Sequence, residues 1–299
     1  MNLLLEGLWQ NASTPEAMPF TAIPRDVTHE CSSARGLPHR RQFLLPTSGA
    51  PGGEQRVTPR FFCPPQLATG TEIVLPRGAA HHAARVLRLA AGTAVTLFDG
   101  EGGECAARLL RVDGKGVIAR VNARIAVERE SPLAITLIQG LASADRMDYA
   151  IRKAVELGVA AIVPVRTARS VSRLDRERAL RRVEHWRQIV VGACEQCGRN
   201  RLPAIRVPCD LLEWLRAPSS ALTRLLPAPD ASLGLSQLAP PAGAIELLVG
   251  PEGGLAPDES AAAVASGFRA VRLGPRILRT ETVAPAALAA MNALWGDWR

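Results

Sequence analysis

The sequence predicts an α/β domain that is preceded by a small β-barrel domain. From residue 133 onward, apolar runs of strand length alternate with segments of helical periodicity, which is typical of a largely parallel sheet with helices on its faces. Residues 57–128 instead carry short apolar runs broken by glycine and Asp-Gly turns, which favour a small barrel. The polar segment 129–132, Arg-Glu-Ser-Pro, is expected to link the two domains.

Residues 1–56 have a different composition from the rest of the chain. They are rich in Pro, Ser, Gly and Thr and show neither helical nor strand periodicity. Because such a segment buries too little apolar surface to offset the entropy of ordering it, we expect it to be disordered. One hypothesis is that the natural protein begins at Val57, since the ordered pattern starts directly afterwards with Arg60-Phe61-Phe62.

The barrel domain is expected to contain one helical segment among its strands. The expected strands are residues 73–75, 94–98, 105–112 and 117–121. The helical segment spans residues 81–88. Within it, Arg85 and Arg88 lie three residues apart and would share one helix face, while Val86 and Leu89 would share another and anchor the segment.

The elements of the α/β domain follow from the period of their apolar residues. Apolar runs at 135–138 and 159–163 predict strands, and the stripe between them predicts a helix that ends at Gly158. Pro257, followed by two acidic residues, opens a further helix. A long helix is predicted over residues 178–197. Its apolar stripe is Leu180, Val183, Trp186, Val190 and Cys194, and its other face carries Arg181, Arg182 and Arg187.

Arginine supplies nearly all of the positive charge. The chain has 36 Lys and Arg against 28 Asp and Glu, a formal net charge of +8, and only Lys115 and Lys153 are lysines. Between Asp145 and Arg201, thirteen basic residues stand against seven acidic ones, an excess of six. Such a local excess is the electrostatic footprint of a protein that binds a phosphate backbone. A genome biased toward Arg and Ala codons is the alternative, because total charge alone does not establish a nucleic-acid partner.

Composition and cysteine usage favour a globular protein of the cytoplasm. The 299 residues are 47% hydrophobic and 21% charged, and they are enough for two domains. Only Cys194 and Cys197 have CxxC spacing, so we expect no metal site and interpret the pair as packing thiols, with a redox or metal pair as the alternative. The run Leu3-Leu4-Leu5 stops at Glu6, so neither a signal peptide nor a membrane span is expected.

Two glycine-bearing turns follow two apolar strands near the C-terminus, at residues 250–254 and 273–282. The carboxyl ends of neighbouring strands form the crevice in which open α/β sheets bind ligands. A GPxGG turn alone also fits an ordinary tight turn, but Arg276, Arg279, Thr280 and Glu281 crowd the second turn with polar groups. Neither turn has the spacing of a phosphate cradle, so the pattern indicates a small molecule other than a nucleoside triphosphate.

Five motifs occur along the chain in a defined order. They are His82-x-x-Arg85-Val86-Leu87-Arg88, Lys153-x-x-Glu156-Leu157-Gly158, Ala193-Cys194-Glu195-Gln196, Gly250-Pro251-Glu252-Gly253-Gly254 and Leu273-Gly274-x-Arg276-Ile277-Leu278-Arg279-Thr280-Glu281-Thr282. With these motifs the sequence resembles the RsmE family, whose members methylate N3 of a uridine in small-subunit ribosomal RNA. The resemblance runs from about Arg60 to Trp298.

The resemblance implies a PUA-like barrel that helps to hold RNA and a SPOUT methyltransferase domain with a trefoil knot near its C-terminus. It also implies S-adenosylmethionine as the methyl donor, 16S ribosomal RNA within the assembled small subunit as the substrate, and a homodimer that builds each site from both chains. The two turns would then wrap the methyl donor, mostly through backbone groups. The residues expected to bind it are Leu248, Gly250, Pro251, Glu252, Gly253, Gly254, Leu273, Gly274, Ile277, Leu278, Arg279, Thr280 and Thr282.

The sequence departs from the family pattern in two places. Pro285 stands where a helix-favouring residue usually follows, which is tolerable only if the last helix begins near residues 281–284. Pro227 and Ala228 stand where relatives often have a His-Pro pair. They fall within residues 218–243, whose pattern is too weak for us to assign an element.

Methylation at N3 requires help because uracil N3 carries a proton and is a poor nucleophile until that proton leaves. Positioning contributes most to an in-line transfer, and a cation beside the uracil oxygens would act as an oxyanion hole does. Arg279 is the first candidate for that cation, with Arg169 or Arg199 as alternatives. Glu281 or Glu195 is expected to accept the proton. Each of these residues also fits a cap or an ion pair that holds its turn.

RNA contacts are expected from basic residues of both domains. They are Arg60, His82, Arg85, Arg88, Arg169, Arg173 and Arg199. Arg181 and Arg182 are further candidates, for which a solvated helix face is the alternative.

Two other functions stay open at this point. Another SPOUT methyltransferase, with a different base or with transfer RNA as its target, would share the two turns, and the barrel argues against it. A non-catalytic RNA-binding protein would explain the barrel and the basic helix but would leave both turns unused. Binding of S-adenosylmethionine separates these two classes.

Overall fold

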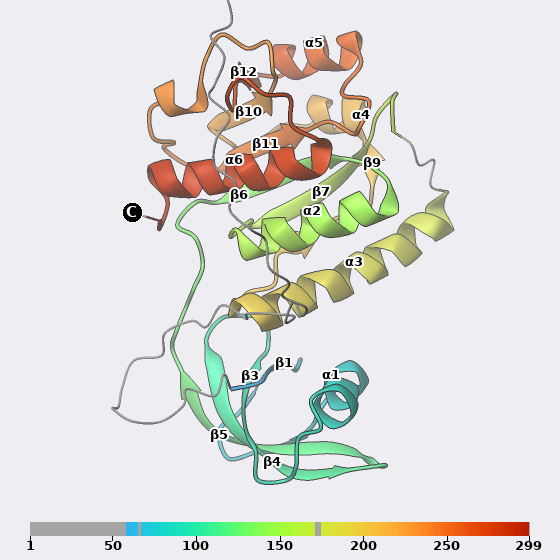
Figure 1. Cartoon of the computed structure of the whole chain (residues 1–299), viewed down its shortest axis with the longest axis vertical. Helices are drawn as coiled ribbons and strands as arrows, with labels where there is room; N and C mark the ends of the chain where they lie inside the picture. Colours follow the sequence, from blue (N-terminus) through green and yellow to red (C-terminus); the bar gives the residue numbers. More distant parts are fainter. Residues whose placement is uncertain (1–57, 65–66, 171–174, 299) are drawn as a thin grey trace, which may run out of the picture. The chain divides into compact units, whose positions relative to one another are not determined.

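The structure is a computed structural model that describes residues 58–64, 67–170 and 175–298 (Figure 1). The predictions for residues 1–56, for a start at Val57 and for Arg173 fall outside this range. The described residues belong to one compact unit. No helix among them is both long enough and apolar enough to span a membrane.

A five-stranded sheet with the order β1-β3-β4-β5-β2 forms the N-terminal domain. Its strands are β1 (Arg60–Phe62), β2 (Glu72–Val74), β3 (Ala94–Phe98), β4 (Glu104–Asp113) and β5 (Gly116–Ile125). β1 pairs with β3 in parallel, and the other pairs are antiparallel. The four predicted strands are confirmed as β2 to β5. β4 and β5 extend beyond the predicted apolar runs. Several of the added residues are exposed, so the apolar pattern did not mark them.

The helical segment of this domain begins and ends earlier than the predicted residues 81–88. α1 (Arg77–His81) continues into one π-helical turn, η1 (His82–Val86). Arg88 follows with a φ of 52°, a left-handed conformation that is uncommon for a residue with a side chain. Arg88 therefore does not share a helix face with Arg85. Val86 is 60% exposed, so the prediction that it anchors the segment is wrong, because the π turn changes the spacing on which it was based.

A parallel sheet with the order β12-β10-β11-β6-β7-β8 forms the C-terminal domain, and β9 also pairs with β7. The strands are β6 (Ile135–Gly140), β7 (Ala161–Arg166), β8 (Ala204–Ile205), β9 (Cys209–Asp210), β10 (Thr223–Pro227), β11 (Ile245–Val249) and β12 (Arg269–Val271). All of their pairings are parallel. The two strands predicted at the start of this domain are confirmed as β6 and β7. β10 lies in the region that the sequence left without an element.

Helices cover both faces of this sheet (Figure 1). They are α2 (Ala144–Glu156), α3 (Arg176–Cys197), α4 (Leu211–Arg216), α5 (Pro257–Ala265) and α6 (Thr280–Trp295), with a short 3-10 turn, η2 (Leu235–Gln237). Apolar residues of α2, α3 and α6 share one core with Leu137 and Leu247. Those of α4 and α5 pack with Ile138 and Leu248, the next residues along the same strands. Because alternate strand residues point to opposite faces, both faces are buried, as the predicted α/β class requires.

The predicted long helix is confirmed as α3, and its ends have identifiable causes. The side chain of Asp175 accepts a hydrogen bond from the backbone N–H of Arg178 at 2.8 Å, and Gly198 ends the helix with a φ of 89°. One member of the predicted stripe is wrong. Leu180 is 51% exposed while Ala179 is buried, so the stripe begins one residue earlier than the sequence suggested.

Pro285 lies inside α6, whose first residue is Thr280. A helix start near residues 281–284 was required to tolerate this proline, and α6 begins one residue before that range. Pro285 has no N–H to donate to the carbonyl of Glu281 four residues earlier. The helix nevertheless continues to Trp295, with Leu288 and Met291 buried in the core.

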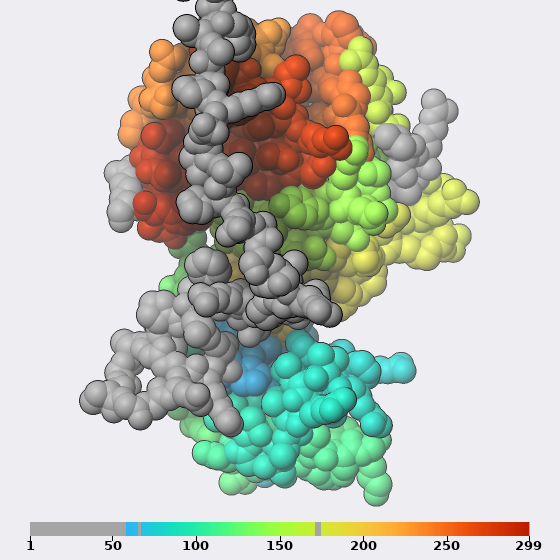
Figure 2. Space-filling model, viewed as in Figure 1, coloured from blue at the N-terminus to red at the C-terminus, as the bar shows by residue number. Residues whose placement is uncertain are grey.

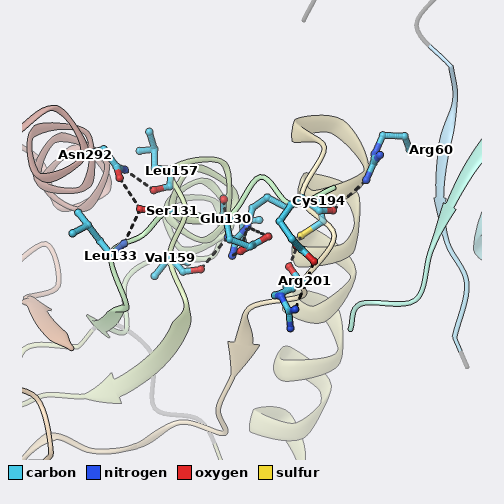
Figure 3. Close-up of polar contacts among 12 residues, drawn as sticks. Arg60, Glu130, Ser131, Leu133, Leu157, Val159, Cys194, Arg201 and Asn292 are labelled. Atoms are coloured by element: carbon cyan, nitrogen blue, oxygen red, sulfur yellow. Dashed lines mark hydrogen bonds and ion pairs between the residues drawn. The ribbon is translucent and has the colours of Figure 1, made fainter. Parts of the chain in front are cut away.

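The segment predicted as a linker is held by buried polar contacts (Figure 3). Arg199 Nε donates to Glu130 Oε2 at 3.0 Å, and Arg199 Nη1 donates to the carbonyls of Val155 and Val159 at 2.9 Å each. Arg199 Nη2 also pairs with Glu130. Arg199 is 4% exposed and all three of its nitrogens are occupied, which contradicts its predicted roles as an RNA contact and as a donor to uracil.

Candidate functional site

A cavity of about 600 Å³ lies where three strands of the parallel sheet end. Its walls come from the segments that follow β10, β11 and β12, together with Arg146 of α2. In Figure 2 the C-terminal segments that contribute most of these walls are coloured orange to red. The volume falls within the range of about 300–1,000 Å³ that is usual for small-molecule sites. The cavity also occupies the crevice that the sequence predicted.

The first turn, which follows β11, is positioned by close backbone contact with the end of β6. A Cβ atom on Gly140 would lie 2.6 Å from the backbone nitrogen of Pro251, so only glycine allows the two segments to approach so closely. Within the turn, the N–H of Gly254 donates to the carbonyl of Pro251 at 2.9 Å. The φ of Gly254 is 69°, a conformation that favours glycine.

The second turn, which follows β12, is tied to the first turn through a threonine. Thr280 Oγ1 donates to the carbonyl of Gly250 at 2.6 Å and accepts from Gln139 Nε2 at 3.3 Å. Thr280 is 8% exposed, so its hydroxyl serves the contact between the turns. Gly274 allows the chain to enter the turn with a φ of 115°.

The third wall was not predicted. It consists of Leu226, Pro227, Ala228, Pro229 and Asp230, at the end of β10. The backbone N–H of Ala228 donates to the carbonyl of Val271 at 2.9 Å, which fixes this segment beside β12. The weak pattern of residues 218–243 gave no signal for it. The sequence left the role of Pro227 and Ala228 open, and in the structure both residues form part of the cavity wall.

Most of the residues predicted to bind the methyl donor line the cavity. They are Gly250, Pro251, Glu252, Gly254, Leu273, Gly274, Ile277, Leu278, Arg279 and Thr280. Three predicted residues are not among its lining. Leu248 is fully buried in the core under α4 and α5. The carbonyl of Gly253 accepts from Arg169 Nη1 at 2.9 Å, and the N–H of Thr282 donates to the carbonyl of Arg279 at 2.8 Å.

The three catalytic candidates are not all brought together. Arg279 and Glu281 line the cavity. Glu195, on α3, instead contacts the N-terminal domain, where its Oε1 accepts from the backbone N–H of Phe62 at 3.0 Å and its Oε2 lies 4.0 Å from His82 Nδ1. Burial raises the pKa of the Glu195 carboxyl above its ordinary value. In this chain Glu195 therefore belongs to the contact between the two domains.

A cation that the sequence did not single out pairs with two carboxylates of the cavity. Arg146, near the start of α2, lies 3.0 Å from Glu252 Oε1 and 3.5 Å from Glu281 Oε2. Hydrogen bonds, the largest from the backbone N–H of Ser143, outweigh desolvation and lower the pKa of Glu252. Arg146 follows the carboxyl end of β6, so the crevice rule applied to β11 and β12 would also have pointed to it.

The predicted RNA contacts have different surroundings. Arg85 and Arg88 are exposed, and Arg169 is exposed even though it donates to Gly253. Arg60 is occupied, because it pairs with Glu104 and donates to Asn200 Oδ1 at 2.6 Å; together with its 12% exposed side chain, this contradicts a phosphate contact. His82 is half-buried beside Glu195. Of the additional candidates, Arg181 pairs with Glu177 on the exposed side of α3, and Arg182 is half-buried.

Cys194 and Cys197 are not joined to each other in this structure. The thiol of Cys194 is buried and lies 3.7 Å from the carbonyl oxygen of Arg201 (Figure 3). Burial raises the pKa of Cys194 to about 12 and also raises that of Cys197. Thiols held protonated in this way are poor nucleophiles and poor metal ligands, which supports the packing role.

Two family models match the chain. A model described as an RNA methyltransferase domain matches residues 129–292, which is more than half of the chain. A model described as an RNA methyltransferase PUA domain matches residues 75–122. The matched ranges correspond to the two domains of the structure.

Named relatives match over most of the chain. The ribosomal RNA small subunit methyltransferase E of Mycobacterium tuberculosis is 34% identical over 237 residues, which cover 77% of this chain and 89% of the relative. Among solved structures, the enzyme of the same name from Neisseria gonorrhoeae, bound to S-adenosylmethionine, is 42% identical with a TM-score of 0.76 and covers 81% of this chain and 100% of its own. A putative methyltransferase from Legionella pneumophila in complex with the same cofactor is 37% identical with a TM-score of 0.77, covering 80% and 99%.

Proposed function

This chain belongs to the family of ribosomal RNA small subunit methyltransferase E, and on that premise we propose that it methylates N3 of a uridine in 16S ribosomal RNA with S-adenosylmethionine as the donor. The observation that carries the proposal is the cavity at the strand ends. Both glycine turns meet there, and Arg279 and Glu281 stand at its wall.

The cavity fits S-adenosylmethionine in its size and in its polar groups. Among the residues that the structure describes, neither Glu252 Oε2 nor Glu281 Oε2, both buried, accepts a hydrogen bond, although Glu281 Oε2 has an ion-pair contact with Arg146 at 3.5 Å. Buried acceptors without a hydrogen bond are costly, so a ligand that brings N–H donors would stabilise them. S-adenosylmethionine carries an ammonium group and an adenine amine. Backbone groups of the turns at Gly250 and Gly274 would hold the rest of the molecule.

The bound donor would supply an electrophilic methyl group, and the residues of the chain would prepare the uracil. We assign Arg279 to the uracil oxygens, where its guanidinium would stabilise the negative charge that develops as N3 loses its proton. Glu281 is the carboxylate in the cavity that we assign to accept this proton. Arg169, which is exposed and held against the first turn, is the alternative cation.

On the RNA side, Arg85 and Arg88 are the best-supported phosphate contacts. Both are exposed, and the described segment 67–98 that contains them has Glu72 as its one acidic residue. Replacing both arginines with glutamine should weaken RNA binding and lower the salt slope by about one to two ions. Lys115→Gln, an exposed cation at the β4–β5 turn, is the control. An unchanged salt slope in the double variant would remove this surface from the RNA site.

We also propose the homodimer, the trefoil knot and the cytoplasmic location that the family resemblance implies. Ile277 supports the dimer, because it stands in the cavity wall and is 84% exposed. A second copy that covered Ile277 would close this side of the site. Sedimentation of the wild type and of Ile277→Asp would test it, with a monomeric variant expected; a monomeric wild type would contradict the dimer.

Two measurements test the proposed function. Calorimetric titration with S-adenosylmethionine should show binding by the wild type, and its absence would favour a non-catalytic RNA-binding protein. Mass mapping of 16S ribosomal RNA from a strain lacking the gene, with and without the purified enzyme, should show one added methyl group on a uridine. Methylation of another base would point to a SPOUT enzyme with a different target.

Arg279→Ala separates catalysis from donor binding. We expect turnover to fall about a hundredfold or more, the usual effect of removing one oxyanion-stabilising donor, while affinity for S-adenosylmethionine changes about threefold at most. Unchanged methylation of small subunits by this variant would remove Arg279 from the mechanism.

A further inference from the structure

The start of α2 lies directly against the first turn. The close approach of Gly140 to Pro251 leaves no room for a side chain between the end of β6 and this turn. Three residues after Gly140, the backbone N–H of Ser143 donates to Glu252 Oε1 at 2.8 Å. The first turn is therefore held from the side by the segment that joins β6 to α2.

Arg146 extends this connection to the second turn. Its Nη1 lies 3.0 Å from Glu252 Oε1 on the first turn, and its Nε lies 3.5 Å from Glu281 Oε2 on the second. The three side chains are 35%, 18% and 21% exposed, so none of them is a fully solvated surface group. One guanidinium thus stands between two carboxylates that belong to different walls of one cavity. A planar group with several fixed donors is suited to hold two carboxylates at a set separation.

We propose that Arg146 is a positioning residue that ties the two cofactor turns to each other and to α2, and so holds the cavity in the form that binds the methyl donor. This inference rests on the proposed function, because it assumes that the turns bind S-adenosylmethionine. Arg146 acts through Glu252 and Glu281, both of which line the cavity with it.

Charge alone predicts the opposite effect, which makes the proposal testable. S-adenosylmethionine carries two positive groups, the sulfonium and the ammonium, and one carboxylate, so it has a net positive charge. Without Arg146 the cavity would become more negative, and electrostatics by itself would tighten binding of this cation. A positioning role predicts weaker binding instead, because the turns would lose the group that fixes their separation.

The decisive comparison uses S-adenosylhomocysteine beside S-adenosylmethionine. The former has a neutral thioether in place of the sulfonium and therefore no net charge, while the rest of the molecule is the same. Calorimetric titration of Arg146→Gln should show a loss of about tenfold for both ligands, so that the ratio of their affinities stays as in the wild type. A change confined to the charged ligand, or a gain in affinity, would overturn the proposal.

Two further variants control for folding and for position. Arg146→Lys keeps the charge but cannot reach both carboxylates with a planar fork, so we expect it to recover part of the lost affinity. No recovery at all would contradict the proposal. Arg152→Gln removes an exposed arginine from the same helix and should bind both ligands as the wild type does.

The proposed function and this inference fail in different ways. If the wild type binds neither ligand, the proposed function is wrong whatever Arg146 does. If the wild type binds both ligands and Arg146→Gln binds them with the affinities of the wild type, the cavity is a cofactor site and Arg146 does not hold its two turns together. Circular dichroism and thermal unfolding would show that Arg146→Gln is folded, and a folded variant is expected because the residue lies at the edge of the cavity.

Discussion

Glu195 carries a charge in surroundings that disfavour it. Burial raises the pKa of its carboxyl from the ordinary 4.5, and the hydrogen bond from the backbone N–H of Phe62, together with the charges of His82 and Arg60, offsets this only in part. In the folded protein Glu195 therefore holds its proton to a higher pH than in the unfolded chain. Glu195 therefore does not reduce the free energy of unfolding in acid. It reduces it as the pH rises above the ordinary pKa and through the raised pKa of the folded state.

Glu195→Gln should consequently stabilise the protein at neutral pH. Glutamine stays uncharged and keeps an oxygen for the N–H of Phe62. Urea unfolding should show the variant equal to the wild type at about pH 4 and more stable at pH 7, with the difference growing between them. A wild type that is the more stable protein at pH 7 would show that the carboxylate charge is stabilised by its neighbours.

Methylation by Glu195→Gln also tests Glu195 as a proton acceptor, since loss of turnover would return it to the mechanism.

Single residues also show where sequence reasoning stops. Arg199 follows a glycine at the end of a basic helix, and from the sequence it resembled an RNA contact. Its partners, Glu130 and the carbonyls of Val155 and Val159, lie about 40 to 70 residues away along the chain. Only the fold brings them together. The sequence therefore shows that Arg199 is a cation in a basic segment, but local charge cannot tell whether that cation is solvated or buried.

At the scale of elements, Gly140 decides how closely β6 approaches the first turn. The sequence predicted a strand there but gave no reason why it should end in glycine. Gly140→Ala would place a Cβ atom 2.6 Å from the Pro251 nitrogen and 2.7 Å from its Cδ, and backbone atoms must move to admit it. We expect affinity for S-adenosylmethionine to fall about tenfold or more, as measured by calorimetry.

Gly192→Ala is the matched control for this change. Gly192 lies inside α3, and a Cβ atom there would meet nothing within 4 Å. Alanine should stabilise this helix by about 0.5–1 kcal/mol and leave ligand binding as it is. Equal ligand affinities for the two glycine variants would mean that the first turn tolerates displacement.

The element that the sequence missed has a physical explanation. β10 is five residues long, contains Arg224 and ends in Pro227. A central strand usually reads as a continuous apolar run. Here Arg224 is buried against Glu246 of β11, with Nε and Oε2 2.8 Å apart, and the guanidinium stacks on Phe268. Between this largely buried ion pair and Pro227, β10 has only Leu225 and Leu226 as an apolar run, which is too short to predict a strand.

At the scale of the whole molecule, the domain order and the cavity were predictable because each has a local signature. Strand and helix periods separate the two domains, and glycine turns mark the strand ends. The contact between the domains has no such signature. It includes Arg60, which donates to Asn200 Oδ1 at 2.6 Å and to the carbonyl of Gly198 at 3.2 Å, directly after α3. Figure 3 shows Arg60 reaching toward the end of this helix.

Arg60→Met should therefore separate RNA recognition from donor binding. The variant keeps the apolar stem but loses the hydrogen bonds that join β1 to the end of α3, and none of these residues lines the cavity. We expect affinity for S-adenosylmethionine within about twofold of the wild type, because distant sites are close to independent. The KM for small ribosomal subunits should rise about tenfold, because the N-terminal domain would no longer hold bound RNA in a set orientation toward the cavity.

Arg120→Met is the matched control for the whole-molecule prediction. Arg120 pairs with Glu72 at 2.8 Å on the exposed surface of the same domain, where an ion pair contributes little. Its kinetics should equal those of the wild type. If Arg60→Met also left the KM for small subunits unchanged, the N-terminal domain would recognise RNA without a set orientation toward the cavity. If Arg60→Met weakened donor binding instead, the contact between the domains would influence the conformation of the cofactor turns through α3 and the parallel sheet.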